Sequence, residues 1–243
     1  MKKYYYDLHI HSCLSPCGDD DNTPNNIAGM AYICGLSIVA LTDHNTCKNC
    51  PAFFEAAKKY GIIPIAGMEL TTSEDIHIVC LFERLDDAIN FDNYINTQRI
   101  KIKNRPEIFG NQTILNENDE AIGEIEDLLI NATNISISEV RELVEGYGGV
   151  CYPAHIDRES NGIITVLGCL PKDTRFNNYE LYDYNKIDEF SQKYEIHKDR
   201  FIISSDAHYL TDIRDKECFF SFEEANAADI TRQLFALLRR SQR

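Results

Sequence analysis

Residues 7–11, Asp-Leu-His-Ile-His, end a β-like run that begins at residue 4, and they place three polar side chains on alternate positions. Side chains alternate between the two faces of a strand, so Asp7, His9 and His11 are expected to point the same way. Two imidazoles on one face of a strand end can bind one metal ion, and a nearby carboxylate can orient one of them. The alternative is a solvated strand face, and the positions of the other histidines decide between the two.

Predicted strands and helices alternate along the rest of the chain. Helices are expected over residues 24–34, 51–60, 186–195 and 224–239. Further strands are expected over residues 37–41, 62–66, 76–82, 150–153, 179–182 and 201–204. Strand followed by helix, repeated along one domain, favours a β/α barrel over an open sheet. We therefore expect a single α/β domain over residues 1–243, with its site at the carboxyl ends of the strands.

One stretch, residues 84–148, is longer than an ordinary connection in such a barrel. Helices are expected within it over roughly residues 86–103, 119–131 and 139–147. This pattern predicts a helical insertion, or a small cap, within the barrel domain.

The charge balance limits the partners. The chain has 24 lysines and arginines against 39 aspartates and glutamates, a formal net charge of −15. This balance argues against a broad basic surface for long nucleic acid, although it does not exclude a nucleotide. No stretch is apolar for the length of a signal peptide or a membrane span. Nine cysteines without a secretion signal indicate reduced thiols, so a cytoplasmic protein is expected.

The histidines provide the strongest functional signal, because six of the seven lie beside strands that a barrel would bring to one rim. These six are His9, His11, His44, His77, His155 and His208. With Glu69, Asp206 and one aspartate of residues 19–21 they make nine possible nitrogen and oxygen ligands, which suits two or three metal ions better than one. Imidazole and carboxylate ligands are typical of Zn, Mn or Fe.

Four thiols leave a second possibility open. Cys47-x-x-Cys50 follows His44, and Cys13 and Cys17 follow the first motif, so these thiols can gather near the mouth of the barrel. A regulatory thiol–metal or redox site there competes with a plainer interpretation, a pair of free thiols at a helix start.

Six short motifs occur in an order that resembles a known family. They are DLHIHS at 7–12, LTDHN at 41–45, GMEL at 67–70, HIVCLF at 77–82, PAHIDR at 153–158 and SSDAHY at 204–209. Together they are similar to the successive motifs of the PHP (polymerase and histidinol phosphatase) family. The resemblance implies a distorted seven-stranded, TIM-like β/α barrel with a trinuclear metal centre that hydrolyses phosphoesters.

The resemblance also implies a distribution of ligands. The first ion is expected to bind His9, His11, Glu69 and Asp206. Glu69 is expected to bridge to a second ion held by His77 and His155, and a third ion is expected to bind His44 and His208. The family usually has Ser-Asp-Gly before a Thr-Pro helix start, whereas this chain has Ser-Pro-Cys-Gly at 15–18. Counting back from the Thr-Pro pair at 23–24 makes Asp19 the matching ligand, with Asp20 as the alternative.

The expected mechanism follows from the charges at such a centre. Water between two divalent ions loses a proton near neutral pH and can attack phosphorus in line, while the ions neutralise the phosphoryl oxygens. Arg158 is the candidate phosphate clamp, with a surface ion pair as its alternative role. Asp7 and Asp43 are expected to orient neighbouring histidines, although Asp43 also suits a capping or turn role. The expected catalytic residues are therefore Glu69, His9, His11, Asp206 and Arg158.

The leading hypothesis is a metal-dependent phosphoesterase that acts on a small phosphorylated metabolite or nucleotide, using two to three ions of Zn, Mn or Fe. An alternative enzyme is an exonuclease or nucleotide phosphatase that trims a 5′ end. A third hypothesis is a non-catalytic, metal-stabilised sensing module. A basic groove leading to the metals favours the exonuclease, whereas a pocket enclosed by residues 84–148 favours the small-molecule phosphatase.

Overall fold

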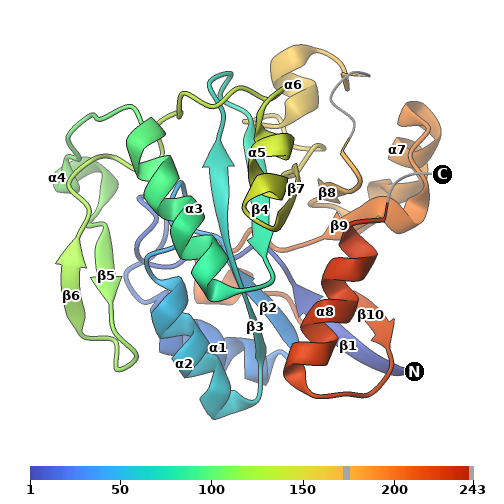
Figure 1. Ribbon diagram of the computed structural model, residues 1–243, viewed down its shortest axis with the longest axis horizontal. Coiled ribbons are helices and arrows are strands. Elements are labelled where there is room, and N and C mark those ends of the chain that lie inside the picture. Colours follow the sequence, from blue (N-terminus) through green and yellow to red (C-terminus); the bar gives the residue numbers. More distant parts are fainter. Residues whose placement is uncertain (172–175, 241–243) are drawn as a thin grey trace.

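A curled six-stranded sheet forms the frame of the molecule in the computed structural model, which describes residues 1–171 and 176–240 (Figure 1). Its strand order is β10-β1-β2-β3-β4-β7. The strands are β1 (Lys2–Asp7), β2 (Ile38–Leu41), β3 (Ile63–Thr71), β4 (His77–Phe82), β7 (Gly149–Pro153) and β10 (Phe219–Phe222). A separate parallel pair, β8 (Tyr179–Leu181) and β9 (Phe201–Ile203), follows β7 in the chain. The α/β class and the curled sheet agree with a barrel, but the strands are divided between this sheet and this pair.

Hydrogen bonds connect the β8–β9 pair to both sides of the curled sheet. The amide of Ile156, just beyond β7, donates to the carbonyl of Glu180 in β8 at 2.9 Å. On the other side, the amide of His11 donates to the carbonyl of Ala207 at 2.9 Å, and Ile10 forms a parallel bridge with Ala207. The residues that follow β1, β7 and β9 are therefore brought to one rim.

Strand β4 runs against its neighbours, which the sequence pattern did not predict. β1, β2 and β3 are mutually parallel, whereas β4 pairs antiparallel with both β3 and β7. A strand of reversed direction presents its first residue at the rim where parallel strands end. His77, the first residue of β4, therefore lies at the same rim as the residues that follow β1, β2 and β9.

Two apolar clusters occupy the two faces of the sheet. One contains alternate residues of β1, β2, β3, β4 and β7 together with Ile230, Leu234, Phe235 and Leu238 of α8 (Ala227–Leu238). The other packs the opposite face against helices that include α1 (Pro24–Ile33), α2 (Cys50–Tyr60) and α3 (Leu85–Gln98). Figure 1 shows α8 beside β1 and β10, with α1 and α2 together below the sheet. Outside residues 84–148, the other helices of the described chain are α6 (Ile163–Leu167), α7 (Ile187–Tyr194) and three single 3₁₀ turns.

Residues 84–148 are only partly helical, so the expected helix over 119–131 is wrong. After α3 come α4 (Pro106–Phe109), a hairpin of β5 (Thr113–Leu115) and β6 (Ala121–Glu124), and α5 (Val140–Gly146). The Asn116 side-chain oxygen accepts from the amides of Asn118 and Glu120, and Asp119 has a φ of 62°. Such side-chain to backbone bonds favour a turn over a helix.

The hairpin is tied to the start of the barrel. Asp119 accepts a hydrogen bond from the Thr23 hydroxyl at 2.6 Å, at the N-cap of α1. Asn49 accepts from the Leu115 amide at 2.9 Å and donates to the Ser12 hydroxyl at 3.0 Å. These contacts fix the insertion beside the loop that follows β1. None of the helices in the described part of the chain has the length and apolarity needed to cross a membrane.

Candidate metal centre

Glu69, buried in β3, lies at the middle of the histidine cluster. Each of its two carboxylate oxygens is close to imidazole nitrogens from several elements. The distances are 2.8 Å to His77 Nδ1, 3.1 Å to His44 Nδ1, 3.2 Å to His155 Nε2, 3.3 Å to His11 Nε2 and 3.4 Å to His9 Nε2. A single carboxylate thus reaches the ends of β1, β2 and β7 and the start of β4.

A second carboxylate closes one side of this cluster. The Nε2 atoms of His9 and His11 lie 3.1 Å apart, and each is 3.3 Å from Asp206 Oδ1. With Glu69 these side chains make a group of four. All four are buried, and their possible ligand atoms lie within 4.8 Å of one another. Two imidazole nitrogens that face each other between two carboxylates share one cation well, whereas they cannot both donate to each other.

Two further groups of possible ligands overlap with the first. One contains His44, Glu69 and His77, and the other contains His11, His44 and His208. The His155 Nδ1 and Asp206 Oδ1 atoms are buried without a hydrogen-bond partner. The structure therefore brings together eight of the nine expected ligands. It groups His44 with Glu69 and His77, rather than only with His208.

The ninth expected ligand, Asp19, lies outside these groups. Its side-chain oxygen accepts from the Asp21 amide at 2.9 Å, which forms a local turn, and Asp20 is exposed. A Cβ on Gly18 would lie 2.3 Å from the carbonyl oxygen of Ser12, so this turn needs glycine there. Burial, and then the charges of Glu69 and Asp206, raise the pKa of the Cys17 thiol.

The electrostatics of the cluster favour the metal-binding forms of Glu69, His44 and His208. For His9 and His11 they do not, because neighbouring carboxylates outweigh burial and raise both pKa values, that of His11 to about 9. The histidines hold the pKa of Glu69 well below its usual range, although burial opposes this. Burial and the neighbouring His11 lower the pKa of His208 to about 4, and burial lowers that of His44 as well. Ionised carboxylates and neutral imidazoles are the forms that bind metal ions.

Two of the possible ligands have backbone conformations that non-glycine residues rarely adopt. His155 has a φ of 28° and Asp206 a φ of 50°, in the turns that follow β7 and β9. Positive φ costs an L-residue on the order of 1 kcal/mol, and such residues concentrate at functional sites. The turns direct these two side chains toward Glu69 and the two histidines that follow β1.

Glu180 is a functional residue that sequence reasoning missed. It is buried in β8, where its Oε2 lies 2.9 Å from His9 Nδ1 and accepts from the His155 amide at 3.1 Å. A carboxylate on Nδ1 keeps the proton there, so that the Nε2 lone pair of His9 faces the centre. A charged residue inside a short apolar strand was the available signal, because charge is rarely buried without a partner.

We therefore expect Glu180→Gln to lower metal affinity or kcat/KM by about ten- to a hundredfold. The reason is that a neutral amide holds the proton on His9 Nδ1 less firmly than a carboxylate does. Isothermal titration with Mn²⁺ and steady-state kinetics measure the two quantities. Glu189→Gln, in α7, is the matched control. Wild-type affinity and activity in Glu180→Gln would show that His9 is oriented without Glu180.

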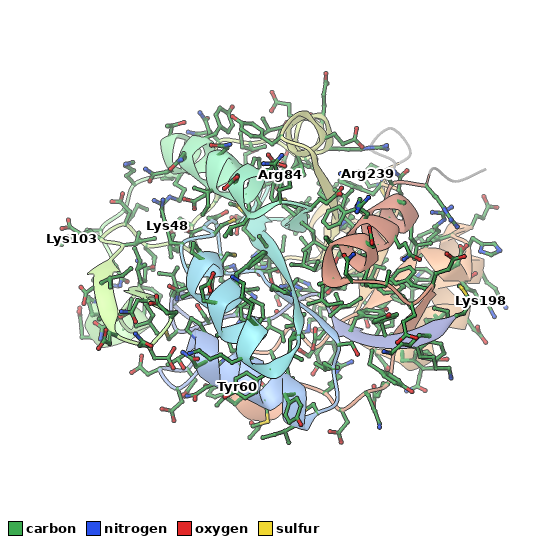
Figure 2. All side chains as sticks on the ribbon, turned by 60° about the horizontal axis from the view of Figure 1, so that its bottom comes forward. Lys48, Tyr60, Arg84, Lys103, Lys198 and Arg239 are labelled. Carbon is green, nitrogen blue, oxygen red and sulfur yellow. The ribbon has the colours of Figure 1, made fainter. Side chains whose placement is uncertain are left out.

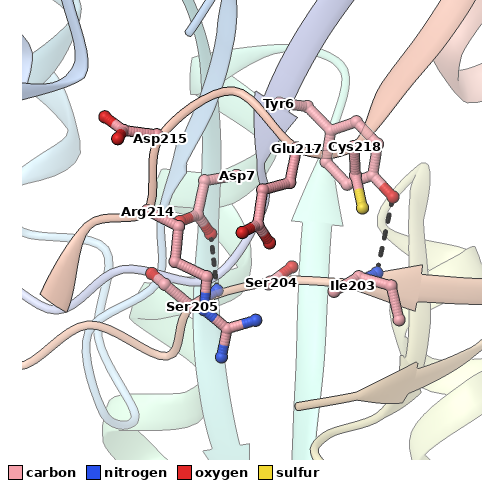
Figure 3. A pocket seen from close by; sticks show the side chains of 9 residues that line it. All are labelled: Tyr6, Asp7, Ile203, Ser204, Ser205, Arg214, Asp215, Glu217 and Cys218. Carbon is pink, nitrogen blue, oxygen red and sulfur yellow. Dashed lines mark hydrogen bonds between the residues drawn. The ribbon is translucent and has the colours of Figure 1, made fainter. Parts of the chain in front are cut away.

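Asp43 and Asp7 support the site in different ways. The Ser15 hydroxyl lies 2.9 Å from His11 Nδ1 and donates to Asp43 at 2.8 Å, so Asp43 orients this histidine through a serine. Asp7 contacts no imidazole. It accepts instead from the backbone amides of His9 at 3.3 Å and Ser205 at 3.1 Å, the second of which Figure 3 shows. Asp7 thereby fixes the backbone that carries ligands from β1 and β9, and burial raises its pKa to about 6.

Arg158 lies at the rim beside the cluster. It donates to Asp206 Oδ2, and its guanidinium carbon lies 4.0 Å from the centre of the Tyr182 ring. Arg214 approaches the same ring at 4.4 Å and donates to the Tyr182 carbonyl at 2.8 Å. Because Asp206 is buried and the Arg158 side chain is 34% exposed, this pair is not a surface ion pair.

The thiols do not form a site of their own. Cys47 donates to the Gly67 carbonyl at 3.1 Å and Cys50 to that of Leu41 at 3.6 Å, and both are buried in the core. Among residues 1–171 and 176–240, no group of possible metal ligands includes a cysteine. The structure thus agrees with free thiols at a helix start.

Comparison with known proteins settles the family. The sequence model of the PHP domain matches residues 7–158, more than half of the chain. The chain belongs to the PHP domain family. This family is metal-dependent, in agreement with the histidine and carboxylate groups described above.

Individual relatives of this PHP chain include nucleases. A "5'-3' exoribonuclease" of Haemophilus influenzae is 39% identical over 90 residues, which cover 36% of this chain and 29% of that protein. The structure of endonuclease Q with a 27-mer duplex substrate matches with a TM-score of 0.67 at 18% identity. The match covers 99% of this chain and 58% of the endonuclease Q chain. A protein assigned as a metal-dependent phosphoesterase from Bifidobacterium adolescentis has a TM-score of 0.59 at 16% identity and covers 96% of both chains. The chain thus spans about a third of the exoribonuclease and over half of endonuclease Q.

These comparisons correct the expectation that long nucleic acid is not a partner. Endonuclease Q shares the fold across nearly the whole chain and is seen in complex with duplex DNA. The expectation rested on net charge, but binding depends on the local distribution of charge and on cations at the site. A net charge of −15 therefore does not exclude a nucleic acid substrate.

Proposed function

We propose that this PHP chain is a metal-dependent phosphoesterase that hydrolyses phosphodiester bonds of nucleic acid. The observation that carries the proposal is the buried Glu69 carboxylate, which has imidazole nitrogens from five histidines at 2.8 to 3.4 Å. So many ionisable groups are costly to bury unless a charged partner satisfies them.

The ligand groups fit two to three divalent ions of the Zn, Mn or Fe type. His9, His11, Glu69 and Asp206 would hold one ion. Glu69 with His44, His77 and His155 would hold a second, and His11, His44 and His208 a third. Bound there, such ions supply Lewis acidity that neutralises phosphoryl charge and lowers the pKa of water.

The chain's own residues contribute orientation and substrate binding. Arg158 is held by Asp206 on one side and by the Tyr182 ring on another, so its remaining N–H groups are available at the rim. A guanidinium fixed in this way can bind a phosphate oxygen beside the ions. Glu180 holds His9, and Ser15 with Asp43 holds His11, so that both imidazoles present the same nitrogen to the centre.

Two observations favour nucleic acid over a small phosphorylated metabolite as the substrate. The relative with 39% identity is named as an exoribonuclease, and its match to this chain covers 90 residues. Endonuclease Q, with the same fold, is seen bound to a polynucleotide.

We regard residues 84–148 as an insertion within a single barrel domain. The insertion lies beside the rim and is not a separate unit.

The test is a hydrolysis panel with protein reconstituted in turn with Zn²⁺, Mn²⁺ and Fe²⁺. Single-stranded RNA and DNA of 20 nucleotides, with and without a 5′ phosphate, are compared with mononucleotides, sugar phosphates and an aryl phosphate. We expect cleavage of at least one oligonucleotide with kcat/KM at least about tenfold above that for any monomer. Preference for a monomer would overturn the nucleic acid assignment, and no hydrolysis of any ester would favour the sensing module.

A further inference from the structure

One short segment of the insertion departs sharply from the acidic character of the chain. Residues 99–105 read Arg-Ile-Lys-Ile-Lys-Asn-Arg, with four basic side chains on alternate positions and no acidic one. The whole chain has 24 basic against 39 acidic residues. Alternate residues of an extended chain share one face, so the four positive charges fall on one side of the segment.

The segment is held extended by a partner stretch, residues 126–133. Arg99 bridges Thr133 and Lys103 bridges Asp127, both antiparallel. Three backbone hydrogen bonds complete the ribbon. The Ile100 amide donates to the Ala132 carbonyl at 3.4 Å, the Leu128 amide to the Ile102 carbonyl at 2.7 Å and the Asn104 amide to the Glu126 carbonyl at 2.7 Å. An extended chain rises about 3.3 Å per residue, so residues 99 to 105 span roughly 20 Å.

The inner end of this ribbon abuts the metal centre. The Thr133 amide donates to the Thr71 carbonyl at 2.9 Å, and Thr71 pairs with His77 in the β3–β4 register. Asn45, which follows His44, donates to the carbonyls of Leu129 at 2.7 Å and Asn131 at 2.9 Å. The ribbon therefore begins beside two metal-ligating histidines and runs outward from them.

The positive charges of the segment are available to a ligand. Lys101 is 57% exposed and its ion pair with Asp127, at 3.6 Å, is long. Lys103 and Arg105 are exposed and have no ion pair within the described ranges 1–171 and 176–240. Arg99 is the exception, because its Nε and Nη1 atoms are buried. Figure 2 shows Lys103 at the outer edge of the molecule, on the side of the β5–β6 hairpin.

We propose that residues 99–105 form a track that binds the sugar–phosphate backbone of a single-stranded nucleic acid and leads it to the metal centre. The inference rests on the proposed function, and it adds the place where the polymer binds. Lys101, Lys103 and Arg105 contact successive phosphates. Ile100 and Ile102 alternate with these residues and therefore lie on the opposite face of the segment. The occupant is a single strand because one row of charges, about 6.6 Å apart along the segment, follows one sugar–phosphate backbone.

The test compares the double variant Lys103→Gln/Arg105→Gln with wild type in the metal-loaded protein. The probe is a fluorescein-labelled, hydrolysis-resistant phosphorothioate 20-mer, and binding is measured by fluorescence anisotropy from 50 to 300 mM NaCl. Each phosphate contact to a single strand contributes about 0.7 to the slope of log K against log salt. We expect the double variant to reduce the slope by about 1.4 and to weaken binding roughly tenfold at 0.1 M salt.

The control variant is Lys193→Gln/Lys198→Gln, which changes the net charge equally in and beyond α7; Figure 2 shows Lys198 at the edge opposite Lys103. It should bind the probe as wild type does. Equal slopes in both double variants, or no binding by wild type, would overturn the track. Equal competition by poly-glutamate at the same charge concentration would assign the segment to an acidic protein instead. If the hydrolysis panel shows no cleavage but the salt slope still differs between the double variant and wild type, the catalytic function is rejected and the track is not.

Discussion

Glutamine in place of Glu69 is expected to lower kcat/KM by at least about a thousandfold and to remove at least one equivalent of bound metal. The reason is that Glu69 is shared by two of the three ligand groups, so one substitution weakens both. An amide is neutral and a poor metal ligand, and the loss of about 4 kcal/mol of transition-state stabilisation corresponds to about 10³ in rate. Steady-state kinetics on the preferred ester and inductively coupled plasma mass spectrometry on the same sample measure both effects.

Glu224→Gln provides the matched control, because this glutamate is exposed and pairs only with Lys2 on the surface. It should retain wild-type activity and metal content. Near-ultraviolet circular dichroism of Glu69→Gln distinguishes a lost ligand from a lost fold. If folded Glu69→Gln kept both its metal and its activity, Glu69 would have no role at the centre.

Most of the clustered side chains were accessible to sequence reasoning because they follow strands in a fixed order. His9, His44 and Asp206 each come just after a short apolar run, and parallel strands end at one rim. The direction of β4 was not accessible, since local apolar pattern contains no information on strand direction. His77 begins its strand instead of following it, and the reversal of β4 puts it at the rim.

Other features depended on contacts that no local pattern encodes. Glu180 lies 171 positions from His9 in the chain, so their pairing is visible only in the folded molecule. The hairpin at 113–124 was missed because its turn depends on side-chain bonds of Asn116 rather than on periodicity. Counting residues back led to Asp19, which lies outside the three ligand groups although its amide donates to the His208 carbonyl at 2.9 Å.

Removal of the metal ions is expected to lower the melting temperature by at least about 8 °C for each ion. The expected ligands come from the ends of β1, β2, β7 and β9, from within β3 and from the start of β4. Bound ions therefore connect the curled sheet with the β8–β9 pair, which backbone hydrogen bonds join to it at few points. Binding at about a thousand times Kd stabilises the folded chain by about 4 kcal/mol. In a protein of this size each kcal/mol shifts the melting temperature by about 2–4 °C.

Differential scanning calorimetry with and without EDTA measures this shift, and readdition of the metal should restore it. Glu69→Gln is the informative comparison, because it should show a smaller metal-dependent shift than wild type, while Glu224→Gln should show the full one. An unchanged melting temperature after complete metal removal would mean that the rim is closed by its hydrogen bonds alone. Those bonds, from Ile156 to Glu180 and from His11 to Ala207, join the β8–β9 pair to the sheet at few points. Hence the rim is where we expect stability to depend most on bound metal.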